Sequence, residues 1–202
     1  MKLERSMVFK GLQQDLITRY GKDKAMMIWD YANEEMLRME TYEAVDKTTK
    51  SILFPAIALY KAIERYAPGE ALGITREYGT KTGLRIKGIF HKVSSLPGVP
   101  TIIWKNMDKI AARMSDGYTC RNVNVTEHEC MMDVVGCPLF DQAKEMGVPE
   151  AVQMICSMDK QYMTGIRGLE YTRTKSLAEG DDCCDYRIVD TREKAHNKQN
   201  GK

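Results

Sequence analysis

One carboxylate stands on an otherwise apolar helical face in the last quarter of the 202-residue chain. With about 100° of rotation per residue of α-helix, Asp159 falls on a face shared with Val152 and Ile155. Cys156 lies at the edge of that face. We expect Asp159 to be partly buried, and a buried carboxylate needs a cationic or hydrogen-bonding partner. That partner is either an arginine of the chain, in a structural ion pair, or a cationic ligand.

Two cysteines occupy positions where a thiol can react. Cys137 precedes Pro138 at the predicted start of a helix, where free backbone N–H groups and the positive end of the helix dipole favour a thiolate. Cys184 alternates with Tyr186 and Ile188 along a predicted strand, which turns its side chain inward. Each position fits a nucleophile, and each also fits a small buried residue with no chemical role.

The six cysteines and three histidines lack the spacing of metal ligands. There is no C-x-x-C and no H-x-x-x-H, which disfavours a structural zinc site or an iron–sulfur cluster. The glycine-rich motifs of nucleotide-binding folds and the G-x-S-x-G of serine hydrolases are also absent. We therefore expect no cofactor and no bound metal.

Composition and charge disfavour several further classes of protein. Apolar residues make up 43% of the chain and charged residues 29%, as in globular domains. The whole net charge of +2 lies in residues 190–202, so no basic surface for nucleic acid is expected. The longest apolar run, residues 52–60, is shorter than the ~20 residues of a membrane span, and the N-terminus has no signal-peptide pattern. We expect a cytoplasmic protein with reduced thiols, no nucleic-acid partner and no membrane partner.

Apolar periodicity predicts the helices of the first half. They are expected over residues 8–20, 26–42, 52–66 and 101–114. Pro55 is tolerated only in the first turn of a helix, so Ser51 or Thr49 is the expected cap of the third one. Four glycines leave open whether the helical pattern of residues 68–93 is continuous. The apolar helical half also favours a homo-oligomer.

Alternating apolar residues predict strands in the second half. Two strands are expected to join near Glu127 and His128. Two helices, residues 138–146 and 149–162, then precede a strand pair, residues 169–178 and 183–189. The predicted fold is α+β, a mostly helical N-terminal half packed on a C-terminal antiparallel sheet with two short helices.

We expect one domain, residues 1–190, followed by a charged flexible tail. Within that domain, residues 1–116 form the mainly helical part and residues 117–190 the strand–helix–helix–hairpin part. The tail covers residues 191–202.

Three motifs occur in a fixed order in this second half. They are Cys137-Pro138, Cys156 with Asp159, and the run from Glu179 through Gly180-Asp181 to Cys184-Asp185, with Arg173 before that run. Together they resemble the L-2-amino-thiazoline-4-carboxylic acid hydrolase family over about residues 50–190. The Glu-Gly-x-x-Cys strand is also similar to the small-molecule-binding domain related to vinyl reductases.

The resemblance implies a hydrolase that acts on a carbon–nitrogen bond of a small cyclic amidine and opens a thiazoline ring to a carbamoyl-cysteine. Such a substrate needs an anion beside its amidinium and a cation beside its carboxylate. We hypothesise that Asp159, with Glu179 or Asp181, holds the amidinium, that Arg173 binds the carboxylate through its planar fork, and that Cys156 adds to the binding site.

The nucleophile is left open at this point. Cys137 or Cys184 attacks the amidine carbon to form a covalent adduct, or a carboxylate such as Asp159 directs water instead. Two alternatives to a hydrolase also stand. One is a sensor domain that binds a small molecule without turnover, and the other is a metal site built on Cys137, Cys156 and Cys184.

Overall fold

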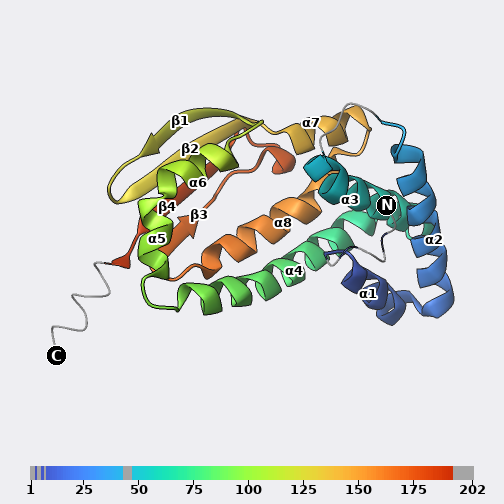
Figure 1. Cartoon of the computed structure of the whole chain (residues 1–202). Coiled ribbons are helices and arrows are strands. Elements are labelled where there is room, and N and C mark those ends of the chain that lie inside the picture. The colour runs from blue at the N-terminus through green and yellow to red at the C-terminus, as the bar shows by residue number, and fades with distance from the viewer. Residues whose placement is uncertain (1–2, 4–5, 7, 43–46, 193–202) are drawn as a thin grey trace. The chain divides into compact units, whose positions relative to one another are not determined.

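The computed structural model describes residues 3, 6, 8–42 and 47–192. Within these residues the chain forms eight α-helices and one four-stranded antiparallel β-sheet (Figure 1), which confirms the predicted α+β class. The chain divides into two compact units: Met1–Thr82 with Gln142–Met158, and Gly83–Asp141 with Asp159–Lys202. None of the described helices combines the length and the apolar character of a membrane span.

The first unit is helical. It contains α1 (Lys10–Tyr20), α2 (Lys22–Met39), α3 (Lys47–Tyr66), the first half of α4 (Ala71–Ser94), the end of α7 (Pro138–Glu145), the 3-10 turn η2 (Pro149–Val152) and the start of α8 (Gln153–Tyr162). Gly21 separates α1 from α2 with a φ of 80°, a conformation that glycine adopts readily. Large apolar side chains of the first three helices are fully buried and form the core of this unit: Leu12, Leu16, Ile28, Trp29, Leu53, Ile57, Leu59 and Ile63.

α3 begins earlier than the apolar pattern predicts. The helix starts at Lys47, so Thr49 and Ser51 lie inside it and the prediction that one of them caps it is wrong. Pro55 stands in the helix interior, where it cannot donate the usual backbone hydrogen bond. Leu53 and Ile57 on either side are fully buried, and packing of this kind supplies most of a helix's stability in a protein.

α4 is one continuous helix despite its four glycines. One of these glycines, Gly79, is required by packing, because a Cβ atom at this position would overlap the backbone carbonyl of Met154 in α8. The backbones of α4 and α8 therefore approach more closely at this point than a larger residue would allow.

The second unit contains the sheet. Its strands are β1 (Thr119–Val125), β2 (Glu129–Gly136), β3 (Leu169–Thr172) and β4 (Cys184–Asp190), in the order β1-β2-β4-β3. The predicted β1–β2 hairpin is confirmed. The last strand pair also forms, but β3 is shorter than expected, and a 3-10 turn, η4 (Leu177–Glu179), lies between the two strands. The helix predicted over residues 101–114 is two helices, α5 (Val99–Lys105) and α6 (Met107–Met114), because the backbone leaves the helical conformation at Asn106.

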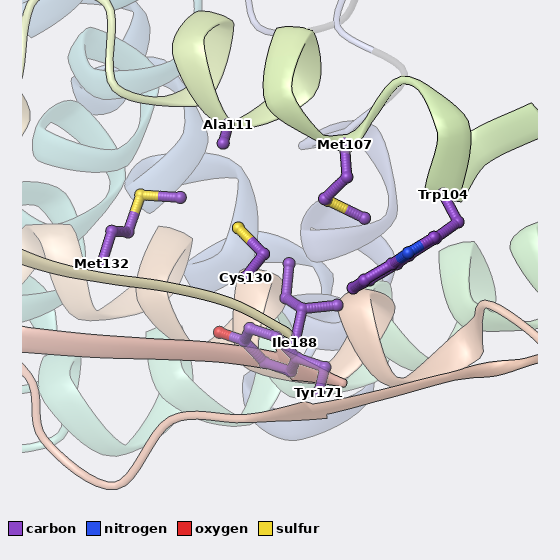
Figure 2. Close-up of a cluster of buried hydrophobic side chains, with 7 residues drawn as sticks. All are labelled: Trp104, Met107, Ala111, Cys130, Met132, Tyr171 and Ile188. Carbon is purple, nitrogen blue, oxygen red and sulfur yellow. The ribbon is translucent and has the colours of Figure 1, made fainter. Parts of the chain in front are cut away.

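One face of the sheet packs against α5 and α6. Side chains of both helices meet side chains of three strands in a buried cluster (Figure 2), made of Trp104, Met107, Ala111, Cys130, Met132, Tyr171 and Ile188. The register places Ile188 of β4 between Cys130 of β2 and Tyr171 of β3. Since side chains on a strand alternate between faces, Cys184 and Tyr186 project from this same face.

Candidate active site

Asp159, in the last turn of α8, is mostly buried, as its helical position predicts, and it forms an ion pair. Arg173 Nη1 donates a hydrogen bond to Asp159 Oδ2 at 3.1 Å, and the two side chains are only 4% and 17% exposed. Arg173 directly follows β3 in sequence, which brings its guanidinium to the sheet face that carries Tyr171. The partner that the sequence left open is an arginine of the same chain.

Two tyrosine hydroxyls complete the surroundings of this carboxylate. The Tyr186 hydroxyl donates to Asp159 Oδ2 at 3.2 Å and accepts a hydrogen bond from Arg173 Nη1 at 3.2 Å. The Arg173 guanidinium also lies over the Tyr186 ring, 5.6 Å from its centre. The Tyr162 hydroxyl, in the same last turn of α8, donates to Asp159. We call these residues, together with Tyr171, the Asp159 cluster.

The phenols of the cluster are hydrogen-bond donors at neutral pH. Burial raises the pKa of Tyr162, Tyr171 and Tyr186, and the nearby negative charge of Asp159 raises each pKa further. The positive charge of Arg173 lowers the pKa of Tyr171 and Tyr186 by a smaller amount. The cluster thus offers one anion, one cation and neutral O–H donors in a region with little access to water.

Cys137 lies at the start of α7, as predicted, and the backbone N–H groups of Phe140 and Leu139 donate to its sulfur. Burial nevertheless raises the pKa of the Cys137 thiol by more than these two hydrogen bonds lower it, and the nearby Cys184 raises it further. The thiol therefore carries its proton at neutral pH. Helix-terminus electrostatics alone gives the opposite expectation, because it omits the burial of the sulfur.

Cys184 is buried, which confirms that it faces inward. Its sulfur accepts a hydrogen bond from the Leu177 backbone N–H at 3.3 Å, and the residue is 7% exposed. Cys183 is also buried, although strand alternation places it on the other face. Cys156 is partly exposed and belongs to the first unit, whereas the other predicted site residues belong to the second.

The acidic residues of the Glu179–Asp185 run contact their own loop. Asp181 Oδ2 accepts a hydrogen bond from the Ser176 backbone N–H at 2.7 Å, and the side chains of Glu179 and Asp181 are exposed. Asp185 accepts from the backbone N–H groups of Thr174 and Lys175 at 2.8 and 2.6 Å and from the Thr174 hydroxyl at 2.6 Å. These contacts fix the segment between β3 and β4. The roles proposed for Glu179 and Asp181 in binding an amidinium stay predictions.

Asp182, the remaining acidic residue of the run, also contacts the segment between β3 and β4. Asp182 pairs with Lys175 Nζ at 2.9 Å and with Arg121 Nη2 at 2.8 Å. The Lys175 ammonium first, and then Arg121, lower the pKa of the Asp182 carboxyl to about 2. This carboxylate is exposed and joins the loop to β1.

No group of three or more His, Cys, Asp or Glu side chains that could hold a metal ion occurs within residues 8–42 and 47–192 or at residues 3 and 6. The structure does not gather Cys137, Cys156 and Cys184 into such a group.

The tyrosines of the Asp159 cluster are not among the site residues that the sequence predicts. A signal existed for Tyr186, which alternates with Cys184 on an inward strand face. Tyr171 and Tyr162 resemble ordinary core aromatics in sequence, and only the fold shows that they lie near the ion pair.

One family model and several solved structures are similar to this chain. The family model for L-2-amino-thiazoline-4-carboxylic acid hydrolase matches residues 42–188. No curated protein matches the chain. A solution structure of the IWP-051-bound H-NOX from Shewanella woodyi in the Fe(II)CO ligation state is 11% identical, with 92% of this chain and 94% of that chain covered and a TM-score of 0.42. A structure from a study of heme distortion in the H-NOX family is 11% identical, with 95% of both chains covered and a TM-score of 0.33. At these TM-scores the folds are only remotely alike.

Proposed function

The chain belongs to the L-2-amino-thiazoline-4-carboxylic acid hydrolase family, and we propose that it hydrolyses a small cyclic amidine that also carries a carboxylate. The observation that supports this proposal is the buried pair of Asp159 and Arg173. A protonated 2-amino-thiazoline-4-carboxylate has an amidinium and a carboxylate on one small ring. Its two charges complement those of the two side chains.

In the proposed complex the substrate replaces one ion pair with two. The amidinium binds Asp159 through two N–H groups, and the carboxylate binds the planar fork of Arg173. Each buried side chain keeps an opposite charge beside it, which matters because an unpaired buried charge is strongly unfavourable. A ligand with a single charge would leave one of the two side chains without such a partner. The cluster should therefore select ligands that carry both charges.

The product defines which bond breaks. A carbamoyl-cysteine keeps both amidine nitrogens on the former ring carbon, so the ring opens between that carbon and sulfur. We therefore expect cleavage of this carbon–sulfur bond, and not of the carbon–nitrogen bond that the resemblance suggested. Water adds its oxygen to the amidine carbon, the electron pair of the carbon–sulfur bond leaves with sulfur, and the resulting thiolate takes up a proton. Pairing of the amidinium with Asp159 keeps the carbon electrophilic for this attack.

Direct attack by water fits the cluster better than attack by Cys137. The raised pKa of the Cys137 thiol means that a base must first remove its proton. A thiol route through Cys137 or Cys184 would form an S-linked isothiouronium, which a water molecule would then convert to the carbamoyl product. The two routes differ in whether a cysteine is required.

The test is a single-turnover assay on 2-amino-thiazoline-4-carboxylate. Ring opening releases a free thiol and adds the mass of one water, and both are measured for the wild type, Asp159→Asn, Cys137→Ala and Cys184→Ala. Asp108→Asn is the matched control, because this carboxylate is exposed and belongs to no proposed binding site. We expect the wild type, the control and both cysteine variants to open the ring, and we expect Asp159→Asn to lose most activity.

Each other outcome has a defined meaning. A folded cysteine variant without activity would establish the thiol route. Full activity of folded Asp159→Asn would contradict the binding scheme. Ligand-induced stabilisation of the wild type without turnover would support the sensor alternative.

A further inference from the structure

The hydroxyl of Tyr171 is buried and has no hydrogen-bond partner among the residues that the structure describes. The residue is 7% exposed, and its ring is part of the hydrophobic cluster that packs against α5 and α6. Figure 2 shows the hydroxyl directed away from Trp104. Buried polar groups are nearly always hydrogen-bonded in native proteins, so an unpartnered one points to strain or to function.

The surroundings of this hydroxyl favour a function. Tyr171 lies close enough to Asp159 and Arg173 for both charges to act on its phenol. Its ring centre is 6.1 Å from that of Tyr186, whose hydroxyl contacts both charged side chains. Among the phenols of the Asp159 cluster, only that of Tyr171 makes no hydrogen bond to a described residue.

We propose that Tyr171 is a specificity-determining residue, whose hydroxyl donates a hydrogen bond to the substrate carboxylate that Arg173 binds. This assignment rests on the proposed function, because it requires a ligand carboxylate beside Arg173. The Tyr171 phenol keeps its proton at neutral pH, so it donates to an anion without carrying a charge of its own. A substrate carboxylate then receives donors from both Arg173 and Tyr171.

The substitution Tyr171→Phe removes only the hydroxyl oxygen and its proton. No hydrogen bond to a described residue is lost, so the melting temperature should stay the same or rise. The substrate carboxylate loses one hydrogen bond to a charged group, and KM for 2-amino-thiazoline-4-carboxylate should rise by about tenfold to hundredfold with little change in kcat. 2-Amino-2-thiazoline lacks the carboxylate, so its inhibition constant should stay the same.

Two control variants separate this role from a structural one. Thr82→Val removes another buried hydroxyl that has no partner among the described residues, and it should leave KM and kcat unchanged. Tyr186→Phe removes a hydroxyl that contacts Asp159 and Arg173, and it should lower the melting temperature as well as the activity.

Four results would overturn the assignment. A Tyr171→Phe protein less stable than the wild type would show that the hydroxyl already has a structural partner. An equal loss of affinity for the acid and for 2-amino-2-thiazoline would show a general distortion of the site. An unchanged KM for the acid, with an active wild type, would refute the role of Tyr171 and leave the proposed function intact. A wild type that neither binds nor opens the acid would refute both.

Discussion

Removing one charge of the Asp159–Arg173 pair should destabilise the second unit strongly. Asp159→Asn keeps the shape of the side chain but leaves the guanidinium of Arg173, 4% exposed, without its carboxylate. Breaking a buried ion pair costs about 3–5 kcal/mol, and the 17% exposure of the Asp159 side chain places the expected loss near the lower bound, about 3 kcal/mol. Arg173→Met should cost somewhat less, about 2 kcal/mol, because the hydroxyls of Tyr186 and Tyr162 still donate to the remaining carboxylate.

The double variant is the decisive measurement. It contains neither buried charge, so its loss should be about 2 kcal/mol smaller than the sum of the two single losses. The chain offers a suitable probe, because its two tryptophans, Trp29 and Trp104, lie in different units. In a Trp29→Phe background the fluorescence of Trp104 reports urea unfolding of the second unit alone. Additive losses, within about 0.5 kcal/mol, would refute the coupling of the two charges.

Three further predictions follow from individual contacts. Gly79→Ala should destabilise the first unit by about 2–3 kcal/mol because the added methyl overlaps the Met154 carbonyl. Gly73 has open space around it, so Gly73→Ala should stabilise the unit by about 0.5–1 kcal/mol. Equal unfolding free energies of the two variants in urea titrations would contradict the close approach of α4 and α8. Burial raises the pKa of the Asp185 carboxyl, but hydrogen bonds from Thr174 and Lys175 outweigh it and lower the pKa below its ordinary value. Its contribution to stability is therefore complete above about pH 4 and fades as the pH falls further, so unfolding free energies of Asp185→Asn measured from pH 6 to pH 2 should decline less steeply than those of the wild type. Cys137, with its raised pKa, should react with iodoacetamide more slowly than a free thiol at pH 7 and faster as the pH rises, and rapid labelling at pH 6 in a peptide map would show a thiolate instead.

The burial of Asp159 could be predicted from the sequence because helical periodicity depends only on local geometry. The identity of its partner could not, because Arg173 reaches it from a different element after the chain has passed through β3. Tyr171 and Tyr186 were missed for the same reason. Their strand positions indicate which face they occupy, but only the pairing of β3 with β4 places the Tyr171 ring beside Tyr186, whose hydroxyl contacts Asp159.

The helices show a similar division between local and tertiary causes. Gly21 separates α1 from α2 for a local reason, because glycine readily adopts its φ of 80°. The early start of α3 was not predicted because local rules place Pro55 in a first turn, whereas the buried side chains on both sides of it hold the helix through the proline. Glycines likewise prevented the prediction that α4 is continuous. Gly79 is needed for packing against α8 and not for a turn.

The contacts of the acidic run suggest how the family motif relates to the chemistry. The loop between β3 and β4 begins at Arg173 and ends before Cys184, and Asp181 and Asp185 hold its backbone. Arg173 supplies the cation of the buried pair, so its position depends on this loop. The acidic run, which is the most recognisable part of the family motif, therefore helps to position Arg173, the residue that we expect to bind substrate. Its acidic residues do so by fixing the backbone of the loop that follows Arg173. On this view Asp185→Asn should raise KM more than it lowers kcat in the ring-opening assay, because it loosens the backbone that follows Arg173 and removes no group from the reacting atoms. A fall in kcat with an unchanged KM would instead place Asp185 in the chemistry itself.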